Sequence, residues 1–560
     1  MKTQKYAFGI SLLLFLVFII FLQQYCYNFF FADDYHLLRY VTDSQQGKGF
    51  REQISLLFDL HNEHRIIFPR LFTLLIYQIE GFIDWKTFNI ISLFYYLGIC
   101  WIFNLAFNKL KVSAWYFLPI PLLLFHPLSH ENIYWTISIL QQVGNLFWAM
   151  LLFWLITNPN KKYFYWAFVV GFVLTFTHGN GLFGLLIAGV ILFLTRRIKD
   201  LLRWALFTIA LFSVYFYQYR SGQNSNVSQS LHHIDMLLRC FFTFWGSITW
   251  HFTNHYNVTN IFAACTGVFI VGPLIIILGK YFFTKLLTPK ITLDDRNLFL
   301  LACFGYLLVT SALVALSRAW IGYGAGLDNR YAHNSLWAIA LLYLTLLLNS
   351  PKAIHKTLGV MAIAGAFVIN VFGWYSSTIK LKYQFDSERA EAFNYRMNGV
   401  IFRESPIFNS NIKQTLALSY KNGISKYSDF DLDVLNSFEN ATIELKKDST
   451  FKLTTVPSTI TIQDAKNPTI LVSYLIEAQA FPYNEDTFLM LHSDKANYLV
   501  PVEHKHGRKT DLLFKGKYFG DGFYATFLTS NLPKGKYQYS IVQKNDKTYK
   551  ITLLEQFLEI

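Results

Sequence analysis

Long apolar stretches recur between residues 7 and 374, and they constrain this chain more than any other feature of its sequence. A helix needs about 20 apolar residues to cross the roughly 30 Å hydrocarbon core of a bilayer. Hydrophobic residues make up 53% of the 560 residues, aromatic residues 18% and charged residues only 15%. This composition is untypical of a water-soluble domain. The sequence therefore predicts an α-helical integral membrane protein with many spans.

The apolar stretches predict about eleven spans, at residues 7–31, 88–107, 114–128, 137–156, 163–178, 181–195, 203–219, 258–279, 297–316, 331–349 and 353–373. The first follows Lys2 and Lys5, and it is too long for a signal-peptide core, so we expect an uncleaved anchor. Residues 66–80 are interpreted as an amphipathic helix on the outer membrane face. A crossing there would place Lys109 and Lys111 outside and invert every later loop.

The distribution of charge between the loops predicts the topology. With Lys2 and Lys5 in the cytoplasm, the loops on the cytoplasmic side are rich in Lys and Arg, whereas the first outer loop, residues 32–87, carries more acidic than basic residues. An odd number of spans then places the C-terminal part of the chain outside. The net charge of +14 arises from basic residues that are spread over the membrane loops and the strand-rich C-terminal part without a compact basic motif, which favours membrane lipids as partners over nucleic acid.

After Trp374 the texture of the sequence changes, because charged and polar residues become frequent. Residues 375–449 predict a helical and polar connector in which Asp386 or Ser387 caps a helix. Residues 450–560 show short alternating segments separated by turns and predict an extracytoplasmic antiparallel β-sandwich. Three domains are therefore predicted. The transmembrane body at 1–374 contains the first outer loop, the connector follows at 375–449, and the β-sandwich follows at 450–560. All five cysteines lie in or beside apolar segments, so no disulfide framework is predicted.

Carboxylates and histidines gather in the loops predicted to lie outside. Asp33 and Asp34 follow the first span directly, and two adjacent carboxylates repel each other on ionising, which can raise the pKa of one and prepare it as a base. Further acids are Glu63, in His61-Asn62-Glu63-His64-Arg65, and Glu131, in a segment that ends at Trp135. A salt bridge to Arg65 or Arg70 is the alternative role for Glu63. A metal site of His61, His64 and His130 is less favoured than ordinary hydrogen bonding.

Three arginines in the same outer loops are candidates for binding an anion. Arg318 and Arg330 flank the Gly-rich segment at residues 322–326, and Arg220 follows the span at 203–219. Arginine binds phosphate oxygens through two parallel hydrogen bonds, so a lipid phosphate is the predicted ligand. Placement of the guanidinium groups at the membrane interface, with no ligand, is the alternative.

The order and sidedness of these features resemble the GT-C superfamily of multi-span glycosyltransferases, which use polyprenyl-phosphate sugar donors. The resemblance covers most of residues 1–374 and rests on the acidic pair after the first span, the long first outer loop, the Glu131–Trp135 loop, the late arginine-rich loop and the soluble outer domain. It implies that Asp33 or Asp34 is the catalytic base, with a slight preference for Asp33. It also implies that the arginines bind the donor phosphate and that Glu63, His64 or Glu131 serves as a second acid or lies at the acceptor site.

The resemblance further implies an inverting transfer of a sugar from a polyprenyl-phosphate donor to a cell-surface glycan, lipid or protein. The expected location is the bacterial inner (cytoplasmic) membrane, with the active site on the extracytoplasmic side. No cofactor is required, and a divalent metal bound by Asp33, Asp34 and Glu63 is not favoured. Two alternatives stay open, a lipid-linked glycan transporter or flippase and a polysaccharide polymerase. The sequence shows no internal repeat of the kind that many transporters have.

Overall fold

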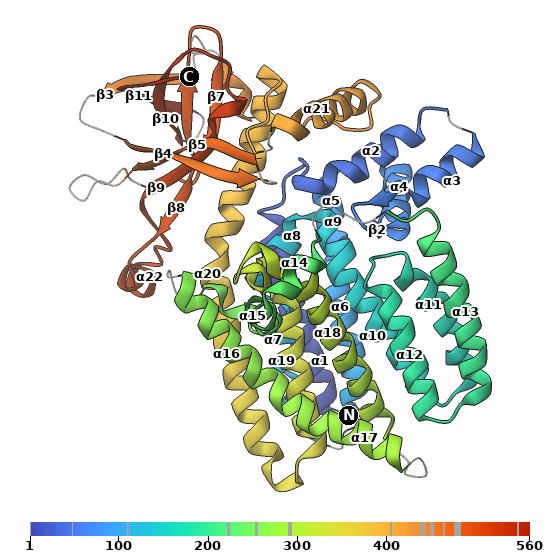
Figure 1. Cartoon of the computed structure of the whole chain (residues 1–560). Coiled ribbons are helices and arrows are strands. Elements are labelled where there is room, and N and C mark those ends of the chain that lie inside the picture. The colour runs from blue at the N-terminus through green and yellow to red at the C-terminus, as the bar shows by residue number, and fades with distance from the viewer. Residues whose placement is uncertain are drawn as a thin grey trace. The chain divides into compact units, whose positions relative to one another are not determined.

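The computed structural model describes most of the chain (Figure 1), namely residues 2–47, 49–108, 110, 112–220, 225–251, 256–288, 294–403, 406–428, 431–436, 443–448, 453–462, 465–474, 483–545 and 548–560. Lys109 and Lys111, which the topology prediction uses, lie outside these residues. The chain forms two compact units. Unit 1 comprises Met1–Gln23, Asp43–Leu75 and Phe88–Ser377, and unit 2 comprises Gln24–Thr42, Ile76–Thr87 and Thr378–Ile560. The predicted outer loop at 32–87 thus contributes residues to both units.

Helices dominate unit 1. The first group of elements that contribute to it is α1 (Lys2–Gln23), α3 (Phe50–Phe58), β1 (Leu60–His61), β2 (His64–Arg65), α4 (Ile67–Glu80), α5 (Trp85–Ser92), α6 (Phe94–Phe107), α7 (Pro119–Leu124), α8 (Glu131–Tyr134), α9 (Thr136–Ser138), α10 (Gly144–Thr157) and α11 (Lys161–Thr175). The second group is α12 (Gly181–Leu194), α13 (Ile198–Phe216), α14 (Val227–His232), α15 (Ile234–Trp245), α16 (Tyr256–Leu274), α17 (Lys280–Leu287), α18 (Asp295–Arg318), α19 (Ala332–Asn349) and the first part of α20 (His355–Asn398).

Seven helices of the described chain are long and apolar enough to cross a membrane, which makes this a membrane protein by length and composition. They lie within Tyr6–Gln23, Trp85–Phe107, Thr136–Thr157, Asn257–Leu287, Asp295–Ile321, Asn329–Asn349 and Lys352–Asn398. Ala114–Ser129 and Gly181–Leu194 are shorter apolar helices. Helix α11 has 15 residues and covers only about 22 Å at 1.5 Å per residue. The count of eleven spans therefore stays a prediction.

The first span ends earlier than the sequence predicts. Helix α1 stops at Gln23 rather than at residue 31, and the chain then leaves the helical conformation. The aromatic residues beyond it belong to unit 2, where Cys26, Phe29 and Phe30 are buried. A run of side chains that fills a protein core looks, in the sequence, like an extension of an apolar span.

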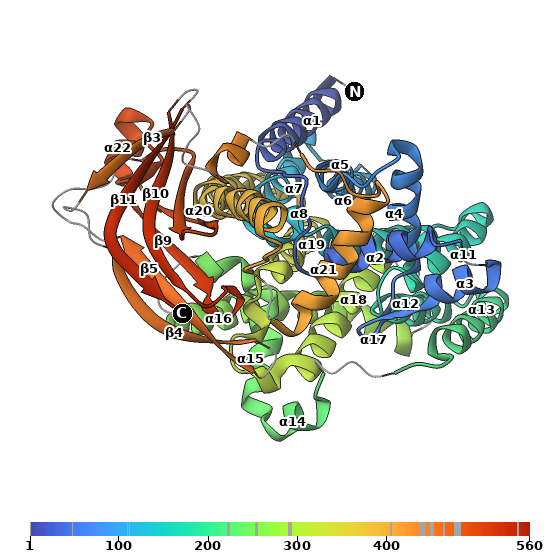
Figure 2. The same cartoon turned by 90° about the horizontal axis from the view of Figure 1, so that it is seen from above.

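Helices α10 and α18 each pack against several neighbours in unit 1. Helix α10 contacts α6, α11, α12 and α18, and α18 also packs against α15 and α19. Both views show α11, α12 and α13 side by side (Figures 1 and 2). Several tryptophans and phenylalanines are fully buried between these helices, among them Trp204, Trp337 and Phe153. This packing fixes the helix ends, and the loops that join them carry the polar residues described below.

Unit 2 contains the β-rich C-terminal region. Its strands are β3 (Ile443–Asp448), β4 (Thr454–Ile462), β5 (Ala465–Tyr474), β6 (Thr487–His492), β7 (Asn497–Pro501), β8 (Glu503–His506), β9 (Phe519–Leu528), β10 (Lys536–Asn545) and β11 (Thr548–Glu559). They form a five-stranded sheet of order β3-β11-β10-β6-β7 and a four-stranded sheet of order β4-β5-β9-β8. One pair, β3 with β11, is parallel, so the region is not purely antiparallel as predicted. Side chains of both sheets share one hydrophobic core, and the sandwich packing stays a prediction.

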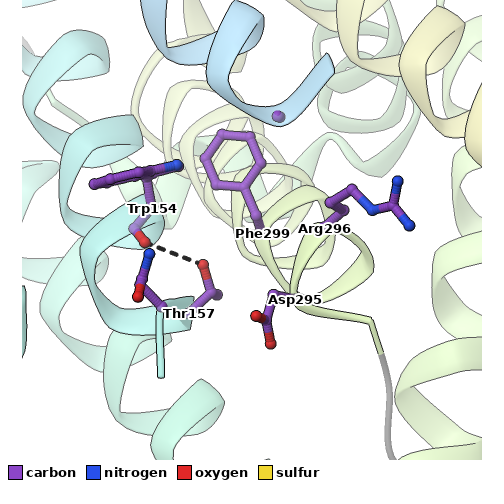
Figure 3. A pocket seen from close by; sticks show the side chains of 7 residues that line it. Trp154, Thr157, Asp295, Arg296 and Phe299 are labelled. Atoms are coloured by element: carbon purple, nitrogen blue, oxygen red, sulfur yellow. Dashed lines mark hydrogen bonds between the residues drawn. The ribbon is translucent and has the colours of Figure 1, made fainter. Parts of the chain in front are cut away.

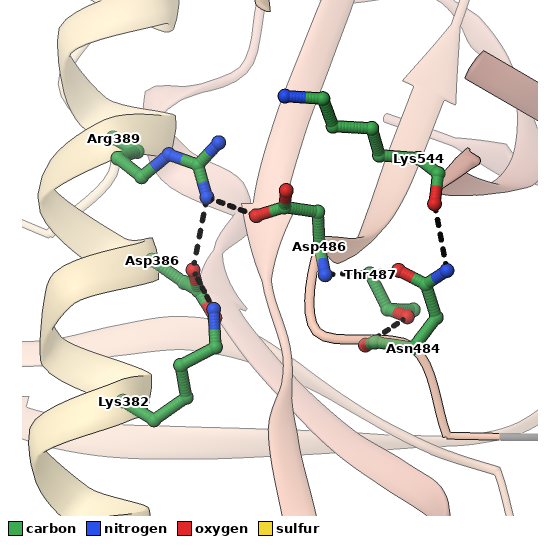
Figure 4. A network of polar contacts seen from close by, with 7 residues as sticks. All are labelled: Lys382, Asp386, Arg389, Asn484, Asp486, Thr487 and Lys544. Atoms are coloured by element: carbon green, nitrogen blue, oxygen red, sulfur yellow. Dashed lines mark hydrogen bonds and ion pairs between the residues drawn. The ribbon is translucent and has the colours of Figure 1, made fainter. Parts of the chain in front are cut away.

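Helices α2 (Tyr35–Ser44), α21 (Pro406–Lys421) and α22 (Lys509–Lys515) also contribute to unit 2, together with the second part of α20. The predicted helix cap at Asp386 or Ser387 is wrong, because α20 continues through both residues. Asp386 is fully buried and accepts a hydrogen bond from Lys382 at 2.8 Å (Figure 4). Arg389 contacts Asp386 and also Asp486 of the segment before β6. Lys382 and Arg389 neutralise the charge of the buried Asp386 carboxylate, which would otherwise destabilise this part of helix α20.

Candidate functional site

The β1–β2 hairpin presents the first group of polar side chains in unit 1. Its strands pair Leu60 with Arg65 and His61 with His64. Asn62, in the turn, has a φ of 52°, a left-handed conformation that asparagine tolerates better than most residues. The tight turn leaves Glu63 at the tip of the hairpin.

Glu63 lies between a histidine and an arginine. Its Oε1 atom is 3.8 Å from Nε2 of His64 and 3.9 Å from a terminal nitrogen of Arg318. Its Oε2 atom is buried and accepts no hydrogen bond from the part of the chain that the structure describes. Arg65 and Arg70, the alternative partners, donate instead to backbone carbonyl groups. The carboxylate is therefore held loosely and keeps an accepting oxygen.

The imidazole of His64 packs against that of His178, with ring centroids 4.1 Å apart. His178 lies in the turn between α11 and α12, and the next residue, Gly179, has no room for a side chain, since a Cβ atom there would lie 2.7 Å from Nδ1 of His64. Burial lowers the pKa of His64 to about 4 and holds the pKa of His178 well below its usual range. Both rings are thus neutral near pH 7 and can exchange hydrogen bonds without adding charge.

A metal site of His61, His64 and His130 is the less favoured alternative in the sequence. His64 has His178 as its ring partner, and His178 was not among the predicted site residues. Among the residues that the structure describes, no group of three or more His, Cys, Asp or Glu side chains is arranged to hold a metal ion.

A second group of polar side chains joins the loop before α8 to the loop before α19. The Glu131 amide donates to Oδ1 of Asn329 at 3.0 Å, and the Arg330 amide donates to Oε2 of Glu131 at 3.1 Å. The side chain of Asn132 donates to the Arg330 carbonyl at 2.8 Å, and that of Asn329 donates to the Leu128 carbonyl at 2.8 Å. These reciprocal bonds satisfy backbone groups that neither loop satisfies by itself.

Glu131 and Asp328 form a pair of carboxyl groups beside Arg330. Burial raises the pKa of Glu131 to about 8, with the charge of Asp328 and a hydrogen bond to it adding to the rise and Arg330 opposing it. Arg330 lies 2.7 Å from Oδ2 of Asp328. Glu131 therefore keeps its proton at neutral pH, while the arginine compensates the charge of the aspartate.

The two groups of side chains form one cluster. The charge of Arg330 acts on His178, and the charges of both Arg330 and Arg318 act on Tyr331. The Arg330 guanidinium also lies 5.7 Å from the ring centroid of Trp135. We name the following set the polar cluster: Glu63, His64, Glu131, His178, Arg318, Asp328 and Arg330. The structure thus brings together five predicted site residues and adds two that sequence reasoning missed, although both missed residues lie in loops of the predicted outer side.

Helix α15 fixes the loop between the two arginines of the polar cluster. A Cβ atom on Gly326 would lie 2.4 Å from the Cys240 carbonyl oxygen, so only glycine allows this approach. The Tyr323 hydroxyl donates to Oδ2 of Asp235 at 2.6 Å, and the Arg239 guanidinium lies 4.7 Å from the centroid of the Tyr323 ring. The loop is therefore held at both its backbone and its aromatic side chain.

Arg220 does not join the polar cluster. Its side chain is exposed and makes no ion pair within the described part of the chain. The neighbouring Tyr219 does lie within electrostatic reach of Glu63.

Asp33 and Asp34 belong to unit 2, whereas the polar cluster belongs to unit 1. They form a 3₁₀ turn in which Asp33 is half-buried and Asp34 is 1% exposed. Oδ2 of Asp34 accepts a hydrogen bond from the Phe31 amide at 3.3 Å. The charges of Asp34 and Arg403 act on Glu388, and the Arg403 guanidinium lies 4.9 Å from the Phe31 ring centroid. Sequence reasoning missed both Glu388 and Arg403, which lie in the predicted connector.

A small pocket elsewhere in unit 1 does not qualify as a substrate site. Trp154 and Thr157 of α10 face Asp295, Arg296 and Phe299 of α18 around it (Figure 3). Its volume of about 10 Å³ holds at most one water molecule.

Comparison of this chain with family models, with curated proteins and with solved structures finds no match.

Proposed function

We propose that this protein is an integral-membrane glycosyltransferase of the GT-C type, which moves a sugar from a polyprenyl-phosphate donor to an extracytoplasmic acceptor. The observation that carries the proposal is the meeting of Arg318 and Arg330 with Glu63 and Glu131 in the loops of a helical membrane unit. Ionisable groups gathered in this way in a membrane protein are expensive to bury and are usually functional.

The arginines supply the chemistry that a lipid-phosphate donor requires. Each guanidinium can donate two parallel hydrogen bonds to phosphate oxygens, and each lies beside a carboxylate. As the bond between the anomeric carbon and the phosphate oxygen breaks, negative charge grows on the leaving phosphate. Positive groups held in place by α15 and by the Glu131 loop stabilise that charge without having to reorganise.

The acceptor hydroxyl supplies the nucleophile. Its oxygen bonds to the anomeric carbon from the face opposite the phosphate, so the configuration inverts, and its proton passes to a carboxylate. Asp33 or Asp34 is the proposed base, on the basis of the family resemblance. Glu63 is suited to bind a substrate hydroxyl in unit 1, because its Oε2 atom accepts no hydrogen bond among the described residues.

Membranes that contain the protein test this proposal with a panel of radiolabelled polyprenyl-phosphate sugars. Arg330→Ala is expected to lower transfer by about a hundredfold or more, since loss of one group that stabilises developing charge typically costs that much. Asp33→Asn and Asp34→Asn, made separately, identify the base. Arg203→Ala is the matched control, because Arg203 is a half-exposed surface arginine of α13.

Two results would contradict the proposal. One is the absence of transfer from every donor in the panel. The other is an unchanged rate in the Arg330 variant and in both aspartate variants. Movement of intact donor across sealed vesicles without transfer would favour a flippase instead.

A further inference from the structure

A cavity of about 540 Å³ opens in unit 1 between helix α3 and the end of helix α13. This volume falls in the range of ordinary ligand pockets, roughly 300–1,000 Å³. Helices α3 and α13, which both line the cavity, are labelled in Figure 2. Charged, polar and apolar side chains all line the cavity, among them those of Arg51, Ile54, Asp59, Ser213, Tyr217 and Gln218.

A single buried guanidinium joins the two walls of the cavity. Arg65 donates to the carbonyl of Phe58 at the end of α3 and to the carbonyls of Tyr215 and Tyr217 at the end of α13. Arg65 is 6% exposed, and its bond to the Tyr215 carbonyl is buried while the other two bonds are partly buried. The cavity is therefore held open by the fold itself, as ligand sites usually are.

The lining suits a ligand with several hydroxyl groups. The Arg65 guanidinium donates to three carbonyl oxygens, and Arg51 and Asp59 carry opposite charges. Ser213 and Gln218 offer both donors and acceptors. Tyr217 is 68% exposed and presents an aromatic face, against which the apolar face of a sugar ring can pack.

The cavity lies next to the polar cluster through the same hairpin. The Tyr215 hydroxyl accepts a hydrogen bond from the Arg65 amide at 3.4 Å, and Glu63 acts electrostatically on Tyr215 and Tyr219. We propose that this cavity binds the neutral sugar of a glycolipid acceptor, with Tyr217 as its stacking platform. The assignment to an acceptor rests on the proposed function, whereas the binding of a sugar does not.

The test uses the full chain in phosphatidylcholine nanodiscs and a photoreactive octyl β-glucoside that carries a diazirine in its alkyl chain. Mass spectrometry then maps the labelled peptides. Labelling is expected in residues 50–59 and 213–218, and excess octyl β-glucoside is expected to compete it away. Tyr217→Ala is expected to reduce labelling roughly three- to tenfold. Val214→Trp, which fills the cavity, is expected to abolish it, and Trp166→Ala on the exposed face of α11 is the matched control.

Labelling outside these segments, labelling unchanged in both cavity variants, or equal competition by a short-chain phosphatidylcholine would overturn the proposal. The last result would identify a lipid-contact groove. Labelling is also measured in Arg330→Ala, which is expected to retain it. Specific labelling in a protein that transfers no sugar would leave the sugar site standing and remove the transferase. Sugar transfer by the wild type without specific labelling would do the reverse.

Discussion

Glu131 and Asp328 share a hydrogen bond between two carboxyl groups, although one is the first residue of α8 and the other lies in the loop before α19. Such a bond needs one proton between the two groups. Burial raises the pKa of Glu131 to about 8, so the proton resides there, and Arg330 is paired with Asp328 at 2.7 Å. The pair thus sets the charge of the polar cluster at neutral pH.

This protonation predicts a pH-dependent stability. The folded protein holds the pKa of Glu131 at about 8, above its ordinary value of 4.5, so it binds more protons than the unfolded chain between these two values. The stabilising contribution is full below pH 4.5 and is lost as the pH rises through 8. Thermal unfolding in detergent at pH 6 and pH 9 measures it. The wild type is expected to lose more of its Tm than Glu131→Gln, which keeps a neutral hydrogen-bonding side chain. Parallel losses in the two proteins would refute the assignment.

Gly326 predicts a steric requirement for the loop that carries the arginines. In Gly326→Ala the new Cβ atom would lie 2.4 Å from the Cys240 carbonyl oxygen, so α15 or the loop must shift. We expect a loss of about 1–3 kcal/mol in unfolding free energy, the usual cost of overpacking, together with reduced sugar transfer. Gly305→Ala in α18 is the control, because its nearest neighbour is 4.0 Å away. If both variants unfold like the wild type, the close approach does not exist.

Replacement of Arg65 is expected to loosen the protein locally, at the cavity walls, rather than throughout unit 1. Arg65→Lys cannot donate to all three carbonyls, and each buried carbonyl left unsatisfied costs about 1–3 kcal/mol. Hydrogen exchange is expected to speed up in residues 50–60 and 213–219, with little change in α18. If hydrogen exchange in these two segments is as slow in the variant as in the wild type, Arg65 does not hold the cavity walls.

The buried position of Asp386 predicts that the stability of unit 2 depends strongly on this one carboxylate. Asp386 is fully buried with Lys382 and Arg389, which are 3% and 7% exposed at their side chains. Asp386→Ala leaves two buried cations without this partner, a change that typically costs about 3–5 kcal/mol. The unfolding of the full chain in denaturant measures the loss. Lys515→Ala, which removes an ion pair whose lysine is 72% exposed, is expected to leave stability unchanged. A loss of equal size in the two variants would argue against a buried network.

The class of this protein could be predicted from its amino-acid residues, because the cost of exposing backbone groups to hydrocarbon forces long apolar segments into helices. The alternation of residues after 450 likewise predicted several strands of unit 2, whereas β3 at Ile443–Asp448 lies in the segment predicted as a connector. The loops that hold Glu63, Glu131, Arg318 and Arg330 could also be identified, since polar clusters stand out between apolar spans. These signals are local, and they depend on side-chain chemistry and spacing alone.

Contacts between residues far apart in the chain could not be predicted and are seen only in the folded protein. The end of α1 depends on Phe29 and Phe30 packing into unit 2, and the continuation of α20 depends on cations that neutralise Asp386. The pairing of Glu131 with Asp328 and of His64 with His178 joins loops far apart in the chain. Such contacts carry no local pattern, because they arise from the packing of helices that fixes where each loop lies. Most of the polar residues of the candidate site could be predicted from the sequence, whereas the residues that they contact are determined by the packing of the fold.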